Sequence, residues 1–386
     1  MILAWWQIVL GVIVGLVILT ILVIVHELGH AVVAKRNGVD VEEFGIGFPP
    51  RAKEFGKVKG TLVTLNWLPL GGFCKMKGEN DDATGKGTYG AASLRAKAKI
   101  LLAGVTMNFL LACLLFTILA LFGIPRIMPG QFAIASDDHG ERGAVGVYSV
   151  VKNSPAERAG LKKGDRLVSV AGKSVGLSSE VPLLTKQNAG RQADIVVIRD
   201  GKKRTVKAKI GDQDNSGRGR LGIQTTQLHA GTVRATWSAP IVGVITAGQF
   251  FRMTLSGLVG LIGNLFQGLW GLVVNSPAAQ AELASVSDGV SGPVGILGQI
   301  FPSAMVAGPI TLLYISGVIS VSLAVMNLLP IPGLDGGRLY LTLWYRARHQ
   351  KLTKEREEKI VGRGMAFLFG LIILITVVDL VKVFHK

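Results

Sequence analysis

The first 25 residues contain a run that favours burial in a lipid bilayer. Residues 4–25 carry no charged side chain, and only Gln7 and Thr20 are clearly polar. About 20 apolar residues are enough for a helix to cross the hydrocarbon core of a bilayer. Three further runs of similar length cover residues 100–124, 310–329 and 365–383. We therefore expect a polytopic α-helical membrane protein with about four transmembrane helices.

A fifth apolar region, residues 241–272, is less uniform. Polar side chains are scattered among its apolar and aromatic residues: Gln249, Arg252, Asn264 and Gln267. This composition is more typical of an amphipathic helix at the membrane surface than of a spanning helix. We expect an interfacial helix, with a fifth span as the alternative.

Lys and Arg are concentrated in two loops, residues 31–97 and 338–363. The positive-inside rule predicts that both loops are cytoplasmic. Four spans put them on the same side, whereas a fifth span would separate them. Residues 126–309 and both termini are then expected outside. The first run lacks a basic start and a small-residue cleavage site, so we expect a retained span rather than a signal peptide.

The formal net charge of +17 has two explanations. Nucleic-acid binding would need a recognised motif or an aromatic-basic platform, and we find neither, so no nucleic-acid partner is expected. Basic loops beside membrane spans and anionic lipid explain the charge more simply. Cys74 and Cys113 are isolated from each other. We therefore expect neither a disulfide framework nor a thiolate zinc site.

The first apolar run ends in the motif His26-Glu27-Leu28-Gly29-His30. Two imidazoles at i and i+4 share one face of a helix, where they can hold a zinc ion while the glutamate handles protons. Ionisable side chains within such a run are costly and are functional by default. The motif also arises by chance, so it does not establish a metal site by itself.

A catalytic zinc site usually has three protein ligands and a fourth position for water. The third apolar run ends in a segment that carries Asn327 and Asp335 and is broken by Pro330, Pro332 and glycines. Irregular backbone at this depth is tolerated only inside protein or beside a watery cavity. Asp335 is expected on the same side as both histidines, so the three can meet.

Two neutral imidazoles and one carboxylate would leave zinc with a net positive charge. That charge can lower the pKa of bound water to about 7 and polarise a peptide carbonyl. Glu27 would then act as general base. The simpler alternatives are that Asp335 belongs to a helix-ending turn, and that Asn327 only satisfies backbone groups freed by the prolines.

Two regions outside the expected spans have patterns of strands and turns. Residues 58–76 predict short strands on both sides of a Pro69-Leu70-Gly71-Gly72 turn. Residues 143–223 predict strands at 145–151, 166–170, 194–199 and 205–210, with one helix capped by Ser154 and another around 180–187. The second region should form a compact α+β module.

With these motifs the chain resembles the site-2 protease family of intramembrane zinc metalloproteases, in the bacterial form with one PDZ domain. The matching segments cover nearly the whole chain: 26–30, 44–48, 69–79, 104–109, 154–165, 291–296, and Asn327 with Asp335-Gly336. The family often has proline at the position of Val105, whereas Asn108 matches the family pattern.

The resemblance implies zinc held by His26, His30 and Asp335, Glu27 as general base, and Asn327 positioning the substrate. Residues 58–76 would present an extended substrate, and the PDZ-like domain would exclude bulky ectodomains or bind peptide tails. It also implies a multi-pass protein of the bacterial inner membrane, with its active site towards the cytoplasm. The substrates implied are single-span membrane proteins, such as anti-sigma factors, or remnant signal peptides.

The predicted organisation has four parts. Residues 1–125 form the first membrane part with the β region at 58–76, and residues 126–230 the inserted extracytoplasmic PDZ-like domain. Residues 231–309 form an amphipathic linker, and residues 310–386 the second membrane part. The β region is expected on the cytoplasmic side.

Two rival functions are a zinc transporter and a proteolytically inactive PDZ scaffold. A transporter needs ligands along a continuous path, whereas the remaining histidines lie outside the expected spans: His139, His229, His349 and His385. An inactive scaffold would not need Glu27 between two histidines. An intramembrane zinc endopeptidase is therefore the prediction.

Overall fold

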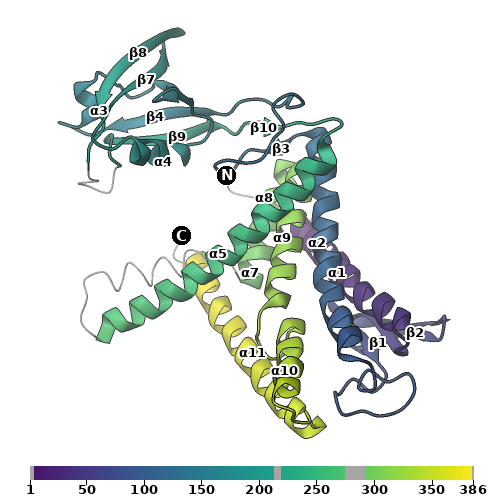
Figure 1. The fold of residues 1–386 in the computed structure, drawn as a ribbon. Coiled ribbons are helices and arrows are strands. Elements are labelled where there is room, and N and C mark those ends of the chain that lie inside the picture. Colours follow the sequence, from purple (N-terminus) through teal and green to yellow (C-terminus); the bar gives the residue numbers. More distant parts are fainter. Residues whose placement is uncertain (1–3, 213–218, 274–291, 385–386) are drawn as a thin grey trace. The chain divides into compact units, whose positions relative to one another are not determined.

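The structure is a computed structural model that describes residues 4–212, 219–273 and 292–384 (Figure 1). The chain divides into two compact units. Unit 1 comprises Met1–Leu115 and Ala247–Lys386, and unit 2 comprises Phe116–Thr246. The predicted soluble module at residues 126–230 therefore falls within unit 2.

Long helices dominate the chain. Within the described residues, five are long and apolar enough to cross a membrane: α1 (Trp5–Arg36), α2 (Leu94–Phe122), α5 (Ala239–Val273), α9 (Pro309–Leu328) and α11 (Lys354–Phe384). Four of them coincide with the predicted spans. The fifth, α5, is the region expected at the interface, and it has the lowest hydropathy of the five. It forms one helix of 35 residues, longer than an interfacial location requires.

Short helices lie before and after α9. The segment α7 (Pro293–Gly295), η1 (Ile296–Ile300) and α8 (Phe301–Ala307) precedes it, and α10 (Asp335–Ala347) follows. α8 packs on the first half of α1, where glycines allow close approach. A Cβ at Gly11 would lie 2.4 Å from Cα of Pro302, and one at Gly15 would lie 2.6 Å from the Phe301 ring. This contact places the start of α9 near the N-terminal half of α1.

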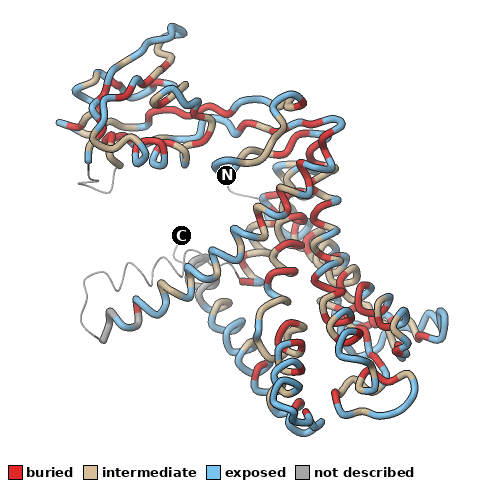
Figure 2. The backbone as a smooth tube through the Cα atoms, in the orientation of Figure 1, coloured by how far each residue is buried: buried red, intermediate tan, exposed pale blue. Residues whose placement is uncertain are grey.

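Between residues 364 and 377, α11 is apolar and most of its residues are exposed (Figure 2). Phe367, Ile373 and Leu374 are among its exposed side chains. A continuous exposed apolar surface of this length marks contact with lipid or with another protein. It is the surface expected of a helix that packs on its neighbours along one narrow stripe within a bilayer.

A β-hairpin follows α1. Strands β1 (Val41–Val58) and β2 (Thr61–Met76) pair across a tight turn at Lys59-Gly60, and both turn residues have positive φ. The strand prediction for residues 58–76 is confirmed by β2. Strand β1 was not predicted, because the proline pair and charged residues at 49–54 obscure its pattern.

The chain reverses within β2, at the predicted Pro69-Leu70-Gly71-Gly72 turn. Residues 43–46 pair on one side with residues 62–65 and on the other with residues 72–75, and the two sets of partners run in opposite directions. Residues 41–48 are therefore central in the small sheet. Residues 72–76 lie at its edge, on the side of α1.

Buried charges connect the loop after β2 to α2, α10 and α11. Lys97 is fully buried and pairs with Asp81. Glu357 accepts a hydrogen bond from the Asp81 backbone N–H at 2.9 Å and pairs with Arg338 at 3.2 Å. The charged groups of Lys97 and Arg338 each lie 5.4 Å from the centre of the Tyr89 ring. Because a buried charge needs a partner, this network fixes α10 against the loop.

Unit 2 contains an antiparallel sheet with strand order β8-β7-β5-β4-β9, and β6 (Lys173–Ser174) pairs with β5. The strands are β4 (Ala144–Val150), β5 (Arg166–Val170), β7 (Gln192–Arg199), β8 (Lys202–Lys209) and β9 (Ile223–His229). Helices α3 (Pro155–Arg158) and α4 (Glu180–Gln187) complete the module. Every strand and helix predicted for this region is confirmed, and β6 and β9 are additions.

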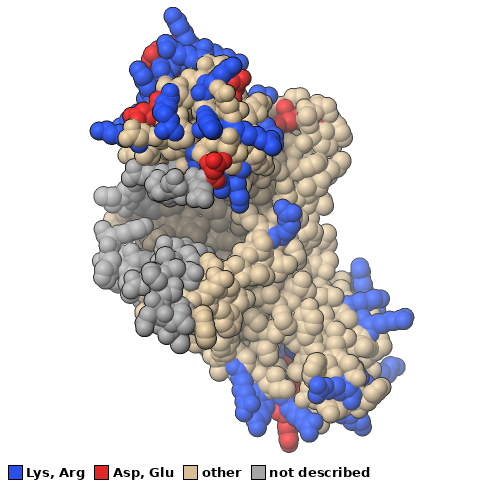
Figure 3. All heavy atoms as spheres, turned by 60° about the vertical axis from the view of Figure 1, so that its left-hand side comes forward, with Lys and Arg blue, Asp and Glu red and all other residues tan. Residues whose placement is uncertain are grey.

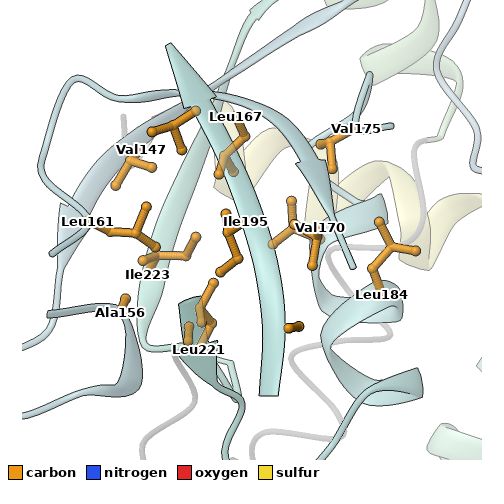
Figure 4. Close-up of a cluster of buried hydrophobic side chains, with 14 of the residues drawn as sticks. Val147, Ala156, Leu161, Leu167, Val170, Val175, Leu184, Ile195, Leu221 and Ile223 are labelled. Atoms are coloured by element: carbon orange, nitrogen blue, oxygen red, sulfur yellow. The ribbon is translucent and has the colours of Figure 1, made fainter. Parts of the chain in front are cut away.

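Alternating apolar residues of these strands form the core of the module. Leu167, Ile195 and Ile223 meet Leu184 of α4 in one cluster (Figure 4). Ser154 caps α3 as predicted, since its hydroxyl accepts a hydrogen bond from the Glu157 N–H. The short strands β3 (Ile124–Pro125) and β10 (Thr232–Val233) pair at the two ends of the inserted segment.

The start of α5 is held by Asp137. Its carboxylate accepts hydrogen bonds from the backbone and side chain of Ser238 and of Thr236. Burial alone would raise the pKa of Asp137, but these hydrogen bonds outweigh it and hold that pKa below its ordinary range. Asp137 thus satisfies the N–H of Ser238, one of the groups that the N-terminus of α5 would otherwise leave unpaired.

Candidate metal centre

His26 and His30 lie in the second half of α1, one turn apart and both buried. Their Nε2 atoms converge to 3.2 Å, so the two rings point at the same place. The Nδ1–H of His30 can donate to the backbone oxygen of Ile100 in α2, at 2.8 Å. This hydrogen bond leaves the lone pair of His30 on Nε2, towards His26.

Asp335 is the first residue of α10, and its Oδ2 lies 3.0 Å from Nε2 of His26 and 3.1 Å from Nε2 of His30. The chain between α9 and α10 packs so closely against Gly336 and Gly337 that neither position has room for a side chain. A Cβ at Gly336 would lie 2.4 Å from the Leu328 oxygen, and one at Gly337 would lie 2.0 Å from the Ile331 oxygen. The Gly-Gly pair therefore lets α10 start close to the end of α9.

The three atoms fit a zinc ion. Tetrahedral ligands at about 2.0–2.2 Å from zinc are about 3.3 Å from one another, close to the observed separations of 3.0–3.2 Å. Within the described part of the chain, these three residues are the group of His, Cys, Asp and Glu side chains placed to hold a metal. Two imidazoles and a carboxylate are also the ligand types that zinc accepts.

The missing side chain of Gly104 in α2 leaves room for the ion. A Cβ at Gly104 would lie 2.5 Å from Nε2 of His30 and 2.6 Å from Nε2 of His26. Any side chain at this position would therefore occupy the space where the ligand atoms converge. Gly104 belongs to the stretch on which the resemblance rests, but no local pattern in the sequence indicates its contact with the histidines.

Glu27 lies between the two histidines in the sequence. Its side chain is half-buried and lies beside the edge segment of β2. A Cβ at Gly72 would be 3.7 Å from its Cγ, and the backbone of Cys74 provides a hydrogen bond to its carboxylate. Cys74 itself is a free, buried thiol. Burial and the nearby Glu27 carboxylate raise the pKa of Cys74 to about 12, so it stays neutral at physiological pH.

Asn327 lies on the last turn of α9 and is half-buried, and its side chain forms no hydrogen bond within the described residues. The structure thus brings His26, His30 and Asp335 together, with Glu27 on the same stretch of α1, and among the described residues it gives the Asn327 side chain no hydrogen bond to them. Two contacts were not predicted: the Ile100 oxygen with His30 and the Asn108 side chain with His26. A backbone oxygen has no sequence signal, whereas Asn108 was noted only as part of the resemblance.

Comparison with known proteins identifies relatives along the full length. The family model described as peptidase family M50 matches residues 14–371. A protein of Clostridium perfringens named as a zinc metalloprotease is 32% identical over 93% of this chain and 95% of its own. The regulator of sigma-W protease RasP of Bacillus subtilis is 25% identical over 96% of this chain and 98% of its own.

Proposed function

Because the chain belongs to peptidase family M50, the site-2 proteases, we propose that His26, His30 and Asp335 hold its zinc ion and that Glu27 is its general base. The protein is an intramembrane zinc metalloprotease that acts in regulated intramembrane proteolysis. The observation that carries the residue assignment is the convergence of three ligand atoms, from helices far apart in sequence, to within 3.2 Å.

When bound, zinc supplies a Lewis acid that polarises the peptide carbonyl and makes water acidic enough to attack at neutral pH. Glu27 takes the proton from the attacking water and passes it to the leaving amine. Each histidine would offer the metal the lone pair of its Nε2. Asp335 contributes the single negative charge of the ligand set, so zinc with its three protein ligands would keep a net positive charge.

The substrate is proposed to bind as an extended strand at the edge of β2. Residues 72–76 pair on one side only, with β1, and this edge adjoins Glu27. A peptide bond within a helix is shielded by its hydrogen bonds, so the substrate helix must unwind before attack. Pairing with a free strand edge would replace the lost helical hydrogen bonds. Asn327, which lies at the end of α9 and before the break that leads to Asp335, is proposed to position the substrate backbone.

The active site is proposed to face the cytoplasm of a bacterial cell. Exposed Lys and Arg gather at one end of unit 1, over the loops that follow α1 and α10, while the helical surface has few (Figure 3). Basic loops of this kind remain on the cytoplasmic side. The module of unit 2 is also basic, but long domains cross the membrane largely regardless of charge.

Helix directions support an interfacial α5. α1 and α2 are antiparallel, since His30 meets Ile100 and His26 meets Asn108. α9 is parallel to α1, because α8 before it packs at Gly11 and α10 after it brings Asp335 to His26. The end of α2 and the start of α9 are therefore on one side. A single crossing by α5, the one helix of crossing length between them in the described ranges, would leave the chain on the other side.

Residues 126–230 are proposed to form an extracytoplasmic PDZ-like domain that binds peptide tails by strand addition. Strand β9 pairs with β4 alone and so offers a free edge. PDZ domains use such an edge, beside a helix, to bind extended peptides. Single-span membrane proteins, such as anti-sigma factors, and remnant signal peptides are the proposed substrates.

The test compares four variants of the full-length protein purified in detergent. Glu27→Gln should retain one zinc ion and lose at least about 100-fold in cleavage of a single-span substrate, the usual contribution of general acid–base catalysis. His26→Ala and Asp335→Ala should lose zinc and activity, and His349→Ala, at an exposed histidine, should keep both. Full activity of Glu27→Gln, or an unchanged zinc content in Asp335→Ala, would refute these assignments.

A further inference from the structure

A zinc-binding His26 needs a hydrogen-bond acceptor for its ring proton, and the three metal ligands do not provide one. If His26 binds zinc through Nε2, as the proposed function states, its proton must be on Nδ1. A buried N–H without an acceptor is costly. The inference below rests on that ligand assignment and concerns the residue that receives this proton.

His30 meets the same requirement through the backbone. Its Nδ1 lies 2.8 Å from the Ile100 oxygen, which can only accept. Main-chain acceptors of this kind commonly orient histidine ligands and fix their tautomer. No backbone oxygen is within hydrogen-bond range of Nδ1 of His26 among the described contacts, and a side chain is there instead.

That side chain is Asn108 of α2, which is 1% exposed. Its Nδ2 lies 3.3 Å from Nδ1 of His26, while its Oδ1 is buried and has no hydrogen-bond partner among the residues that the structure describes. With His26 in the tautomer required for zinc, two donors would face each other and one acceptor would be unused. A half-turn of the amide exchanges the two atoms and removes both conflicts.

We infer that Asn108 is a positioning residue, whose Oδ1 accepts the Nδ1–H of His26 and thereby directs the Nε2 lone pair to the metal. Asn108 is well placed for this role, because α2 is fixed beside it. The Asn108 backbone oxygen accepts a hydrogen bond from the Ser320 hydroxyl of α9 at 2.7 Å. Gly104, one turn earlier in α2, adjoins the same two histidines.

The test measures zinc affinity of the full-length protein in detergent, by competition with a chelator. Asn108→Leu removes the acceptor at nearly constant volume, and zinc affinity should fall 10–100-fold, as for other orienting partners of histidine ligands. Asn108→Asp keeps an acceptor and should bind zinc within a few-fold of the original chain. Ser316→Ala removes a buried hydroxyl of α9 that bonds the Leu312 oxygen of its own helix, and it should leave the affinity unchanged.

A second readout separates this role from a general effect on folding. With ¹⁵N-labelled histidine in the zinc-loaded protein, the Nδ1–H proton of His26 should resonate downfield as a hydrogen-bonded proton in the original chain, and Asn108→Leu should lose that downfield shift. Unchanged zinc affinity in Asn108→Leu, or an equal loss in Asn108→Asp, would overturn the inference. Failure of the ligand assignment itself would be seen separately, as zinc retained in His26→Ala.

Discussion

Gly104 is the single residue on which space for the metal most directly depends. Its missing side chain leaves the volume into which Nε2 of both histidines point. Gly104→Ala should therefore abolish zinc binding and cleavage, since a Cβ there would lie 2.5 Å from His30 Nε2. Zinc content and cleavage rate are the measurements.

Gly260→Ala is the matched control, because a Cβ at Gly260 in α5 meets nothing within 4 Å. It should keep both zinc and activity. Stoichiometric zinc in Gly104→Ala would show that the metal lies elsewhere.

The residue types at the site could be predicted from the sequence, because two histidines at i and i+4 share a helix face. The closeness of Gly104 could not, because it depends on how two helices pack.

At the level of strands and helices, an ion pair fixes the module of unit 2. Arg199 of β7 donates through Nε and Nη2 to the two oxygens of Asp165, each at 2.6 Å. Burial alone would raise the pKa of Asp165, but Arg199 outweighs it and lowers that pKa below its ordinary value. The unfolded chain has an ordinary Asp pKa of about 3.9. The carboxylate thus stabilises the fold above about pH 4, and this stabilisation is lost as the pH falls further.

Asp165→Asn should destabilise the module by about 3 kcal/mol at pH 7, since Arg199 loses its charged partner. The variant should also lose less stability than the original chain between about pH 5 and pH 2. Hydrogen exchange of β5 and β7 measures both effects. Asp194→Asn, at an exposed position of β7, should change neither. Equal exchange rates in the two variants would contradict the role given to the ion pair.

The elements of this module were predictable because their signals are local. The Ser154 cap, the turn before Asp165 and the alternation in β5 and β7 all act within a few residues. Strand β1 and the buried pair of Lys97 with Asp81 were not predictable. Both depend on partners that only the folded chain brings together, and a buried lysine has the same sequence pattern as a solvated one.

For the whole molecule, the central prediction is its orientation in the membrane. A chain with Cys74 and Cys113 replaced by Ala can carry single cysteines at exposed positions: Lys202 in β8, Gln267 in α5 and Lys351 after α10. In intact cells, a membrane-impermeant maleimide should label positions 202 and 267. Position 351 should be labelled only after the membrane is permeabilised.

Labelling at 267 tests the direction argument for α5, because a spanning α5 would carry this position to the opposite side from 202. Labelling of 351 in intact cells would reverse the proposed orientation. From length and composition alone, the sequence predicted four of the five helices that, among the described residues, are long and apolar enough to cross a membrane. It could not decide α5, whose polar residues suit both locations, and the contacts of α1, α2 and α9 supply the missing directions.

X-ray absorption at the zinc edge tests the metal centre most directly. The full-length protein should show two imidazole nitrogens and carboxylate or water oxygens at about 2.0–2.2 Å, with no sulfur at about 2.3 Å. Asp335→Ala should bind no zinc, or should bind zinc with one oxygen ligand fewer. A sulfur ligand, or a spectrum identical in Asp335→Ala and the original chain, would contradict a zinc ion shared by α1 and α10.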